Sequence, residues 1–206
     1  MKILDAIKHR VRPDRMVAAN AESRRALLNL LPIGSVGAEV GVWKGDFSAQ
    51  ILERVRPVKL HLIDPWSFQA DLPKAWYGGA SATSQLDMDA IHDGVCKRFA
   101  RQIADGVIDV HRAPSEVAAN GFSPGELDWV YLDGDHRYEA VRDELVRFGA
   151  FVKPGGYVVG DDYHSGGWWE GGVKRAVDEW AETTKLDDVQ ILGSQFVARL
   201  AAPSEA

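Results

Sequence analysis

Two aspartates and a histidine lie close together in the segment WVYLDGDHRY, residues 129–138. Asp133, Asp135 and His136 follow a run of four large apolar residues. Such a run is typical of a strand that is buried on both faces. A neutral histidine at this place could act as a general base near pH 7. The segment therefore predicts chemistry at the end of a buried strand.

A second acidic group follows the apolar segment PGGYVVG, where Asp161 and Asp162 stand side by side. If the two strands are neighbours in one sheet, both aspartates lie close to Asp133. Three unpaired carboxylates would repel and raise one another's pKa. A hard divalent cation removes the conflict and prefers oxygen ligands, so the cluster predicts a Mg²⁺ site.

Alternatives stay open for these carboxylates. The Asp161–Asp162 pair can instead cap the following segment or form ion pairs with Lys174 or Arg175. Asp135 can replace Asp133, although Asp133 is favoured because it directly follows the buried run.

A metal site of this kind indicates a reaction at a hydroxyl group, because Mg²⁺ acidifies a bound hydroxyl and holds it in place. The hydroxyl then needs a base, and His136, three residues after Asp133, is the predicted one. His164, which follows the DDY segment, is the rival.

The turn AEVGVWKGDFS carries Gly41 and Gly45. The dinucleotide fingerprint G-x-G-x-x-G fails here, because Trp43 and Asp46 occupy two of its glycine positions. Glu39 and Asp46 would repel a pyrophosphate and favour a cationic ligand. S-adenosylmethionine carries a sulfonium and an ammonium group but no phosphate, and it suits this turn.

Asp64 ends the next apolar segment. A carboxylate at that place can accept both hydroxyls of a ribose. The alternative is a plain glycine turn with Asp64 as a helix cap.

The elements that must position these residues alternate along the chain. Apolar strand patterns are predicted at 36–42, 58–66, 106–113, 127–135 and 154–163, and then at 188–194 and 195–201. Helical patterns are predicted at 47–56, 87–106, 114–122, 138–152 and 171–184. This order predicts an α/β, Rossmann-like, mostly parallel sheet with helices on both faces. Only Gly193 and Ser194 separate the last two strands, so a C-terminal antiparallel β-hairpin is expected.

The rest of the chain is interpreted as part of a single domain, residues 1–206. Residues 1–32 predict a helical extension, in which Ile3, Ile7 and Val11 share one face. Because this extension lies outside the core pattern, a homodimer is plausible. The segments 65–85 and 163–172 are predicted substrate or lid loops, because long irregular loops in a domain often have a function.

Taken in order, AEVGVWKGDFS, HLIDPW, RAPSE, DWVYLDGDHRYEAVRDEL and PGGYVVGDDY resemble the class I S-adenosylmethionine-dependent methyltransferases. The resemblance is to the metal-dependent O-methyltransferases, which include a catechol type and a macrocin type that acts on sugar hydroxyls. It implies a seven-stranded sheet with a C-terminal hairpin. It places the metal ligands at Asp133, Asp161 and Asp162, and some sugar-modifying relatives have a basic histidine at the position of His136. The cofactor-binding residues expected on this basis are Glu39, Gly41, Gly45, Ser48, Asp64, Ser115 and Asp133.

Aromatic residues in the two loops predict the acceptor side. Flat aromatic faces rimmed by polar groups suit a sugar or an aromatic acceptor, although the same rings can simply pack the loops. The predicted strand ends carry no lysine of the kind that catechol-type relatives use as base, which favours a saccharide or glycoside acceptor. The expected substrate residues are Tyr163, His164, Trp168 and Trp169.

Composition excludes several other classes of protein. The 206 residues carry a net charge of −6, which disfavours nucleic-acid binding, and the one cysteine, Cys96, excludes a disulfide framework. No signal peptide and no membrane span are predicted, so a cytoplasmic protein is expected. A nucleotide-binding oxidoreductase and a non-catalytic ligand-binding module remain as alternative functions.

Overall fold

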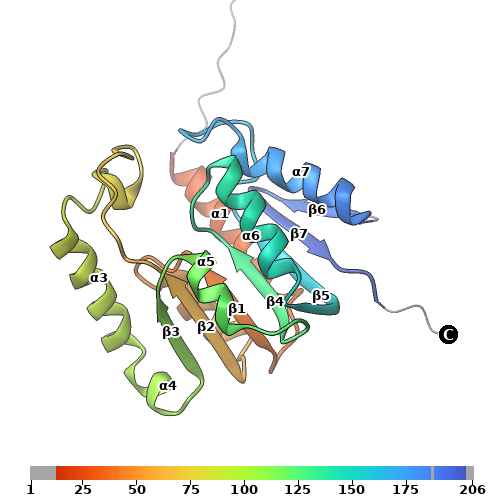
Figure 1. Cartoon of the computed structure of the whole chain (residues 1–206), viewed down its shortest axis with the longest axis horizontal. Helices are drawn as coiled ribbons and strands as arrows, with labels where there is room; N and C mark the ends of the chain where they lie inside the picture. Colours follow the sequence, from red (N-terminus) through yellow and green to blue (C-terminus); the bar gives the residue numbers. More distant parts are fainter. Residues whose placement is uncertain (1–12, 187, 203–206) are drawn as a thin grey trace, which may run out of the picture.

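The computed structural model describes residues 13–186 and 188–202. Seven strands form one sheet in the order β3-β2-β1-β4-β5-β7-β6, which confirms the predicted α/β class (Figure 1). The strands are β1 (Val36–Val40), β2 (Lys59–Asp64), β3 (Ile108–Arg112), β4 (Leu127–Leu132), β5 (Val152–Gly160), β6 (Val189–Leu192) and β7 (Gln195–Arg199). The predicted helical face of Ile3, Ile7 and Val11 lies outside the described residues.

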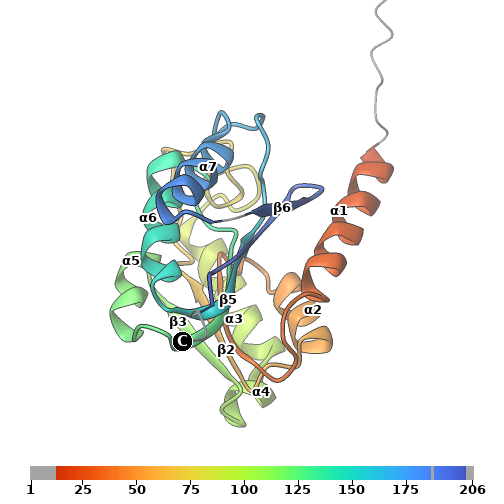
Figure 2. The same ribbon diagram turned by 90° about the vertical axis from the view of Figure 1, so that its right-hand side faces the viewer.

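Helices cover both faces of the sheet. The main ones are α1 (Pro13–Leu28), α2 (Asp46–Arg54), α3 (Gln85–Arg98), α4 (Ala100–Ala104), α5 (Ser115–Ala118), α6 (Tyr138–Gly149) and α7 (Gly172–Thr184). Figure 2 shows α1 and α2 on one side of the sheet and α5, α6 and α7 on the other. Two separate clusters of buried apolar side chains fill these layers. No helix in the described part of the chain is long and apolar enough to cross a bilayer.

The central strand β4 shows why the sheet has this order. Its last four residues, Trp129 to Leu132, are all buried, as expected for a parallel strand with helices on both faces. β4 pairs in parallel with β1 on one side and β5 on the other. The carboxyl ends of β1, β2, β4 and β5 therefore share one edge of the sheet.

The C-terminal hairpin has the predicted form. β6 and β7 are antiparallel, and β7 also pairs antiparallel with β5. Gly193 has a φ of 63°, a left-handed conformation that glycine adopts without strain in a two-residue turn.

Two predicted elements differ from the structure. The helix expected at 87–106 is interrupted at Phe99, which leaves helical geometry while its ring is buried in the core. The loop at 65–85 contains a short 3₁₀ helix, η1 (Trp76–Gly78). It is also fixed to the domain, because the buried Trp66 donates its indole N–H to the carbonyl of Trp43 at 2.9 Å.

Helix α1 ends at Leu28, before the expected stop at Pro32. Leu27, Leu28 and Leu31 are buried in the core on the α2 side of the sheet. The helix also contacts the β6–β7 hairpin, where the hydroxyl of Ser194 lies 3.1 Å from the amide oxygen of Asn20. The part of the N-terminal extension that the structure describes is therefore packed onto the sheet at its C-terminal end.

Candidate functional site

The turn between β1 and α2 lies directly against the end of β4. Gly41 and Gly45 both have left-handed φ values, 89° and 74°. A Cβ added to Gly41 would lie 2.1 Å from the carbonyl oxygen of Asp133, so only glycine fits there. This close approach joins the predicted cofactor turn to the predicted metal site.

Asp64 holds this turn together. Its carboxylate accepts backbone N–H groups from Val42 and Trp43 at 3.0 Å and from Trp66 at 2.7 Å. Burial raises the pKa of Asp64, and these three hydrogen bonds oppose the shift. These bonds anchor the turn, and none of the three N–H groups belongs to a helix, so they are not those of the helix cap that was the alternative interpretation from the sequence. Ribose binding by Asp64 stays a prediction.

Glu39 and Ser48 lie beneath the turn and bind each other. The Ser48 hydroxyl donates to Glu39 Oε2 at 2.6 Å, and Glu39 is only 1% exposed. Burial raises the pKa of Glu39 to about 8, although the Ser48 hydrogen bond opposes the shift. A buried acid of this kind favours a cation beside it.

Asp133 and Asp161 meet at the ends of β4 and β5, and an arginine lies between them. The Nη2 atom of Arg24, from α1, is 3.1 Å from Asp133 Oδ2 and 2.6 Å from Asp161 Oδ2. Burial raises the pKa of Asp133, and the charge of Asp161 adds to this shift. Burial would also raise the pKa of Asp161, but Arg24 and the Ser194 hydroxyl hold it below its usual value. The sequence carried no local signal for Arg24, which is far from both aspartates along the chain.

Asp162 faces the other way, toward two histidines. Its two carboxylate oxygens lie 3.2 Å from His136 Nε2 and 3.3 Å from His164 Nε2. Burial lowers the pKa of His136, and Asp162 opposes the shift, so the imidazole is neutral near pH 7. The structure thus brings both predicted base candidates to one carboxylate. The backbone of Asp162 is left-handed, with a φ of 61°, which separates its side chain from that of Asp161.

A possible cation site combines members of both groups. Ligand atoms of Asp133, His136 and Asp162 all lie within 4.8 Å of one another. The predicted set contained Asp161 in place of His136. Both oxygens of Asp161 are hydrogen-bonded, Oδ2 to Arg24 and Oδ1 to Ser194 and the Asp162 N–H. Metal binding by the predicted set is not tested by this geometry and stays a prediction.

The neighbouring positions have partners of their own. Asp135, the alternative to Asp133, forms an ion pair with Arg137 and is not a member of the cation site. Ser115 begins α5, close to the buried Glu144 of α6. Burial raises the pKa of Glu144 to about 7, although a hydrogen bond from Ser115 opposes the shift. Glu144 was not predicted from the sequence, where it is one of several acids in an amphipathic helix.

The predicted acceptor residues lie beside His136. The Trp169 ring is edge-on to His136, with centroids 4.8 Å apart, and Trp168 packs against Trp169. Tyr163 lies nearby but donates its hydroxyl to Asp178 of α7 at 2.6 Å. Trp169 Nε1 is buried without a hydrogen-bond partner, which leaves a free donor beside the histidine pair.

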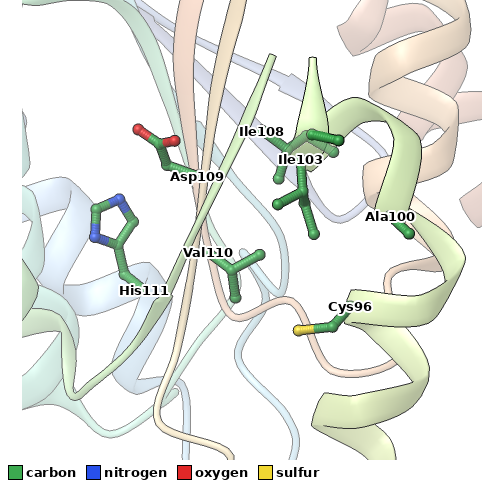
Figure 3. A pocket seen from close by; sticks show the side chains of 8 residues that line it. Cys96, Ala100, Ile103, Ile108, Asp109, Val110 and His111 are labelled. Atoms are coloured by element: carbon green, nitrogen blue, oxygen red, sulfur yellow. The ribbon is translucent and has the colours of Figure 1, made fainter. Parts of the chain in front are cut away.

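A hollow of about 630 Å³ lies away from these strand ends, between α3, α4 and the edge strand β3. In Figure 3, Ile108 and Val110 face Cys96 and Ile103, whereas Asp109 and His111 point to the opposite side of the strand. None of the predicted site residues lines the hollow. The site is therefore assigned to the strand ends.

Comparison with known proteins agrees with this geometry. The family described as "Methyltransferase domain" matches residues 38–163. The O-methyltransferase NovP superposes with a TM-score of 0.58 at 20% identity, over 91% of this chain and 79% of NovP.

Two further proteins extend the comparison. The O-methyltransferase TomG from Streptomyces achromogenes, solved with S-adenosylmethionine, has a TM-score of 0.53 at 13% identity, over 93% of this chain and 81% of TomG. An uncharacterized protein, R132, of Acanthamoeba polyphaga mimivirus is 38% identical over 45 residues, which is 22% of this chain. This chain spans about a fifth of the length of that viral protein.

Proposed function

The chain belongs to the methyltransferase domain family, and from this premise we propose that it methylates a hydroxyl of a small acceptor with S-adenosylmethionine as donor. The proposed acceptor class is a saccharide or glycoside. The observation that carries the proposal is the contact between the glycine turn at Gly41 and the end of β4 at Asp133, three residues before His136.

The acids at this edge support the proposed donor. Glu39 and Asp133 are buried acids with raised pKa values beside the turn, and a sulfonium or ammonium group would lower these pKa values toward the usual range and so favour the charged carboxylates. When bound, S-adenosylmethionine supplies a methyl group. The acceptor oxygen gains the methyl carbon, the S–CH₃ electron pair goes to sulfur, and the hydroxyl proton passes to the protein.

His136 is the proposed acceptor of that proton. Asp162 Oδ2 lies 3.2 Å from its Nε2 atom, so the carboxylate would hold the Nε2–H, leave Nδ1 to take the proton and stabilise the resulting imidazolium. His164 shares Asp162 but is more exposed, with 43% of its side chain accessible against 18% for His136. Of the two histidines we therefore propose the less exposed one, His136, as the base.

A divalent cation, Mg²⁺ in the first instance, is the second part of the proposal. Asp133 and Asp162 provide oxygen ligands, and His136 lies within reach of the same point. Such an ion would acidify the acceptor hydroxyl. His136 can act as base only while its Nε2 is not a metal ligand, so the two roles exclude each other.

The acceptor class follows from the aromatic side of the site. Trp168 and Trp169 meet at right angles beside His136, and the free Trp169 N–H could bind an acceptor oxygen. A catechol-type acceptor would use the same rings. We also propose that the protein forms a homodimer and is cytoplasmic.

The test begins with binding. Adenosylhomocysteine at 100 times its dissociation constant should stabilise the native protein by about 2.7 kcal/mol, measured by thermal unfolding. NADH serves as the control for an oxidoreductase. Transfer of a labelled methyl group is then measured with sugar acceptors and aromatic diols, with and without EDTA. Stabilisation by NADH and none by adenosylhomocysteine would reject the proposal, and full activity in EDTA would remove the metal from it.

A further inference from the structure

Arg24 enters the site from outside the matched family region. It lies on α1, whereas the family match begins at residue 38. Its guanidinium bonds Asp161 Oδ2 through Nε at 3.1 Å and through Nη2 at 2.6 Å. The same Nη2 atom also bonds Asp133 Oδ2 at 3.1 Å.

The surroundings of Arg24 hold it in this position. The guanidinium lies 5.2 Å from the centroid of the Phe47 ring, and one turn earlier Asn20 contacts Ser194. Ser194 also bonds Asp161 Oδ1 at 2.5 Å. The side chain of Asp161 is only 3% exposed, so its charge is compensated almost entirely by these protein groups.

We propose that Arg24 is a positioning residue that neutralises the Asp133–Asp161 pair in the place of a metal ion. It thereby leaves Asp133 and Asp162 as the carboxylates open to a divalent cation. The open cation site rests on the proposed function, whereas the role of Arg24 at the Asp133–Asp161 pair does not depend on it.

Charge and geometry both support this role. A guanidinium is always protonated and forms several directed hydrogen bonds, so it is a permanent cation between two acids. A divalent ion bound to both Asp133 and Asp161 would have to displace it from Asp161, where it makes two of its three bonds. The adjacent residues Asp161 and Asp162 therefore have separate tasks, the first to hold α1 and the second to face His136.

The test measures Mn²⁺ affinity by electron paramagnetic resonance in Arg24→Gln and in a matched control, Arg25→Gln. Arg25 is the next residue of α1, carries the same charge and is exposed. Removing Arg24 frees the buried pair, so Arg24→Gln should bind Mn²⁺ about tenfold or more tightly than the control. Adding Asp161→Asn to Arg24→Gln should abolish this gain.

Single substitutions in the protein that keeps Arg24 give a second test. Asp161→Asn should change Mn²⁺ affinity by about twofold or less, whereas Asp162→Asn should weaken it about tenfold or more. This arm decides the question if circular dichroism shows that Arg24→Gln does not fold. Equal losses in the two single variants overturn the proposal, as does an Arg24→Gln protein that binds Mn²⁺ no better than Arg25→Gln.

Adenosylhomocysteine binding is measured in the same samples. A native protein that does not bind adenosylhomocysteine contradicts the proposed function, while the Mn²⁺ comparison still decides the role of Arg24. If Arg24→Gln binds Mn²⁺ and the native protein binds none, the role of Arg24 at the Asp133–Asp161 pair is supported, and the open cation site at Asp133 and Asp162 is contradicted.

Discussion

The carboxyl ends of the strands carry two groups of residues, the turn side around Glu39 and Asp64 and the histidine side around Asp162 and Trp169. The two sides differ in how many of their polar groups have hydrogen-bond partners. On the turn side, Asp64 accepts three backbone N–H groups and Glu39 binds Ser48. On the histidine side, Trp169 Nε1 has no partner and Asp162 is held in a left-handed conformation.

This difference separates binding from chemistry. The turn side is a preformed scaffold whose hydrogen bonds do not need a ligand. The histidine side keeps a free donor, the Trp169 N–H, which an acceptor can complete. Specificity for the acceptor is therefore expected to lie on the histidine side, and stability on the turn side.

The largest expected effect tests the histidine side. His136→Ala should reduce methyl transfer by about a hundredfold to ten-thousandfold, because a general base contributes a factor of this order. Adenosylhomocysteine affinity, measured by calorimetry, should change by about twofold or less, since the turn side is untouched. His164→Ala is the control, and a larger loss of activity in that variant would exchange the two roles.

The pH dependence of the free energy of unfolding tests the turn side. Glu39 has a raised pKa of about 8 when folded, so the acid is protonated in the folded state and ionises more readily in the unfolded one. Its contribution to stability is present below the unfolded pKa near 4.5 and is lost as pH rises toward 8. Between about pH 5 and 8, Glu39→Gln should therefore gain up to about 4 kcal/mol relative to the native protein.

Urea unfolding at several pH values measures this gain. Glu126→Gln, on the surface before β4, is a suitable control. An equal and constant difference at every pH would show that Glu39 is ionised in the folded protein.

Asp64→Ala tests whether the turn is a scaffold. Three buried backbone donors would lose their acceptor, which should lower the free energy of unfolding by about 3 kcal/mol. Asp46→Ala, at the exposed start of α2, should cost about 0.5 kcal/mol or less. Similar small losses in both variants, measured in urea, would mean that Asp64 does not anchor the turn.

The smallest effect concerns the free donor. Trp169→Phe removes the unpartnered N–H and keeps most of the ring, so the free energy of unfolding should rise by about 1 kcal/mol. The KM for the acceptor should rise while the affinity for adenosylhomocysteine stays the same. Trp168→Phe is the control, and an unchanged KM in Trp169→Phe would show that the N–H does not bind the acceptor.

The sequence was sufficient for the fold and for bringing the candidate site residues to one edge of the sheet. Apolar periodicity located the strands, and the rule that ligands bind at the carboxyl ends of parallel strands brought Glu39, Asp64 and Asp133 together. Sequence could not show which of the neighbours Asp161 and Asp162 faces His136, because that depends on a single left-handed φ.

The contacts of Arg24 with Asp133 and Asp161 could not be predicted from the sequence either. Its partners are 109 and 137 residues away, and only the packing of α1 on the sheet brings them into contact. An exposed-looking arginine in an amphipathic helix gives no local sign of such a pair. Two of the three N–H groups that Asp64 binds belong to the distant turn at Val42 and Trp43, so the residues around Asp64 in the sequence do not indicate them.

The contact of α1 with the hairpin turn ties the two ends of the described chain to the site. Arg24 lies before the family match and Ser194 after it, yet both bond Asp161. A gene trimmed to the conserved family limits would thus encode a protein with an uncompensated acid at its centre. Engineering of this enzyme, including fusions and transplanted domains, should keep both flanks.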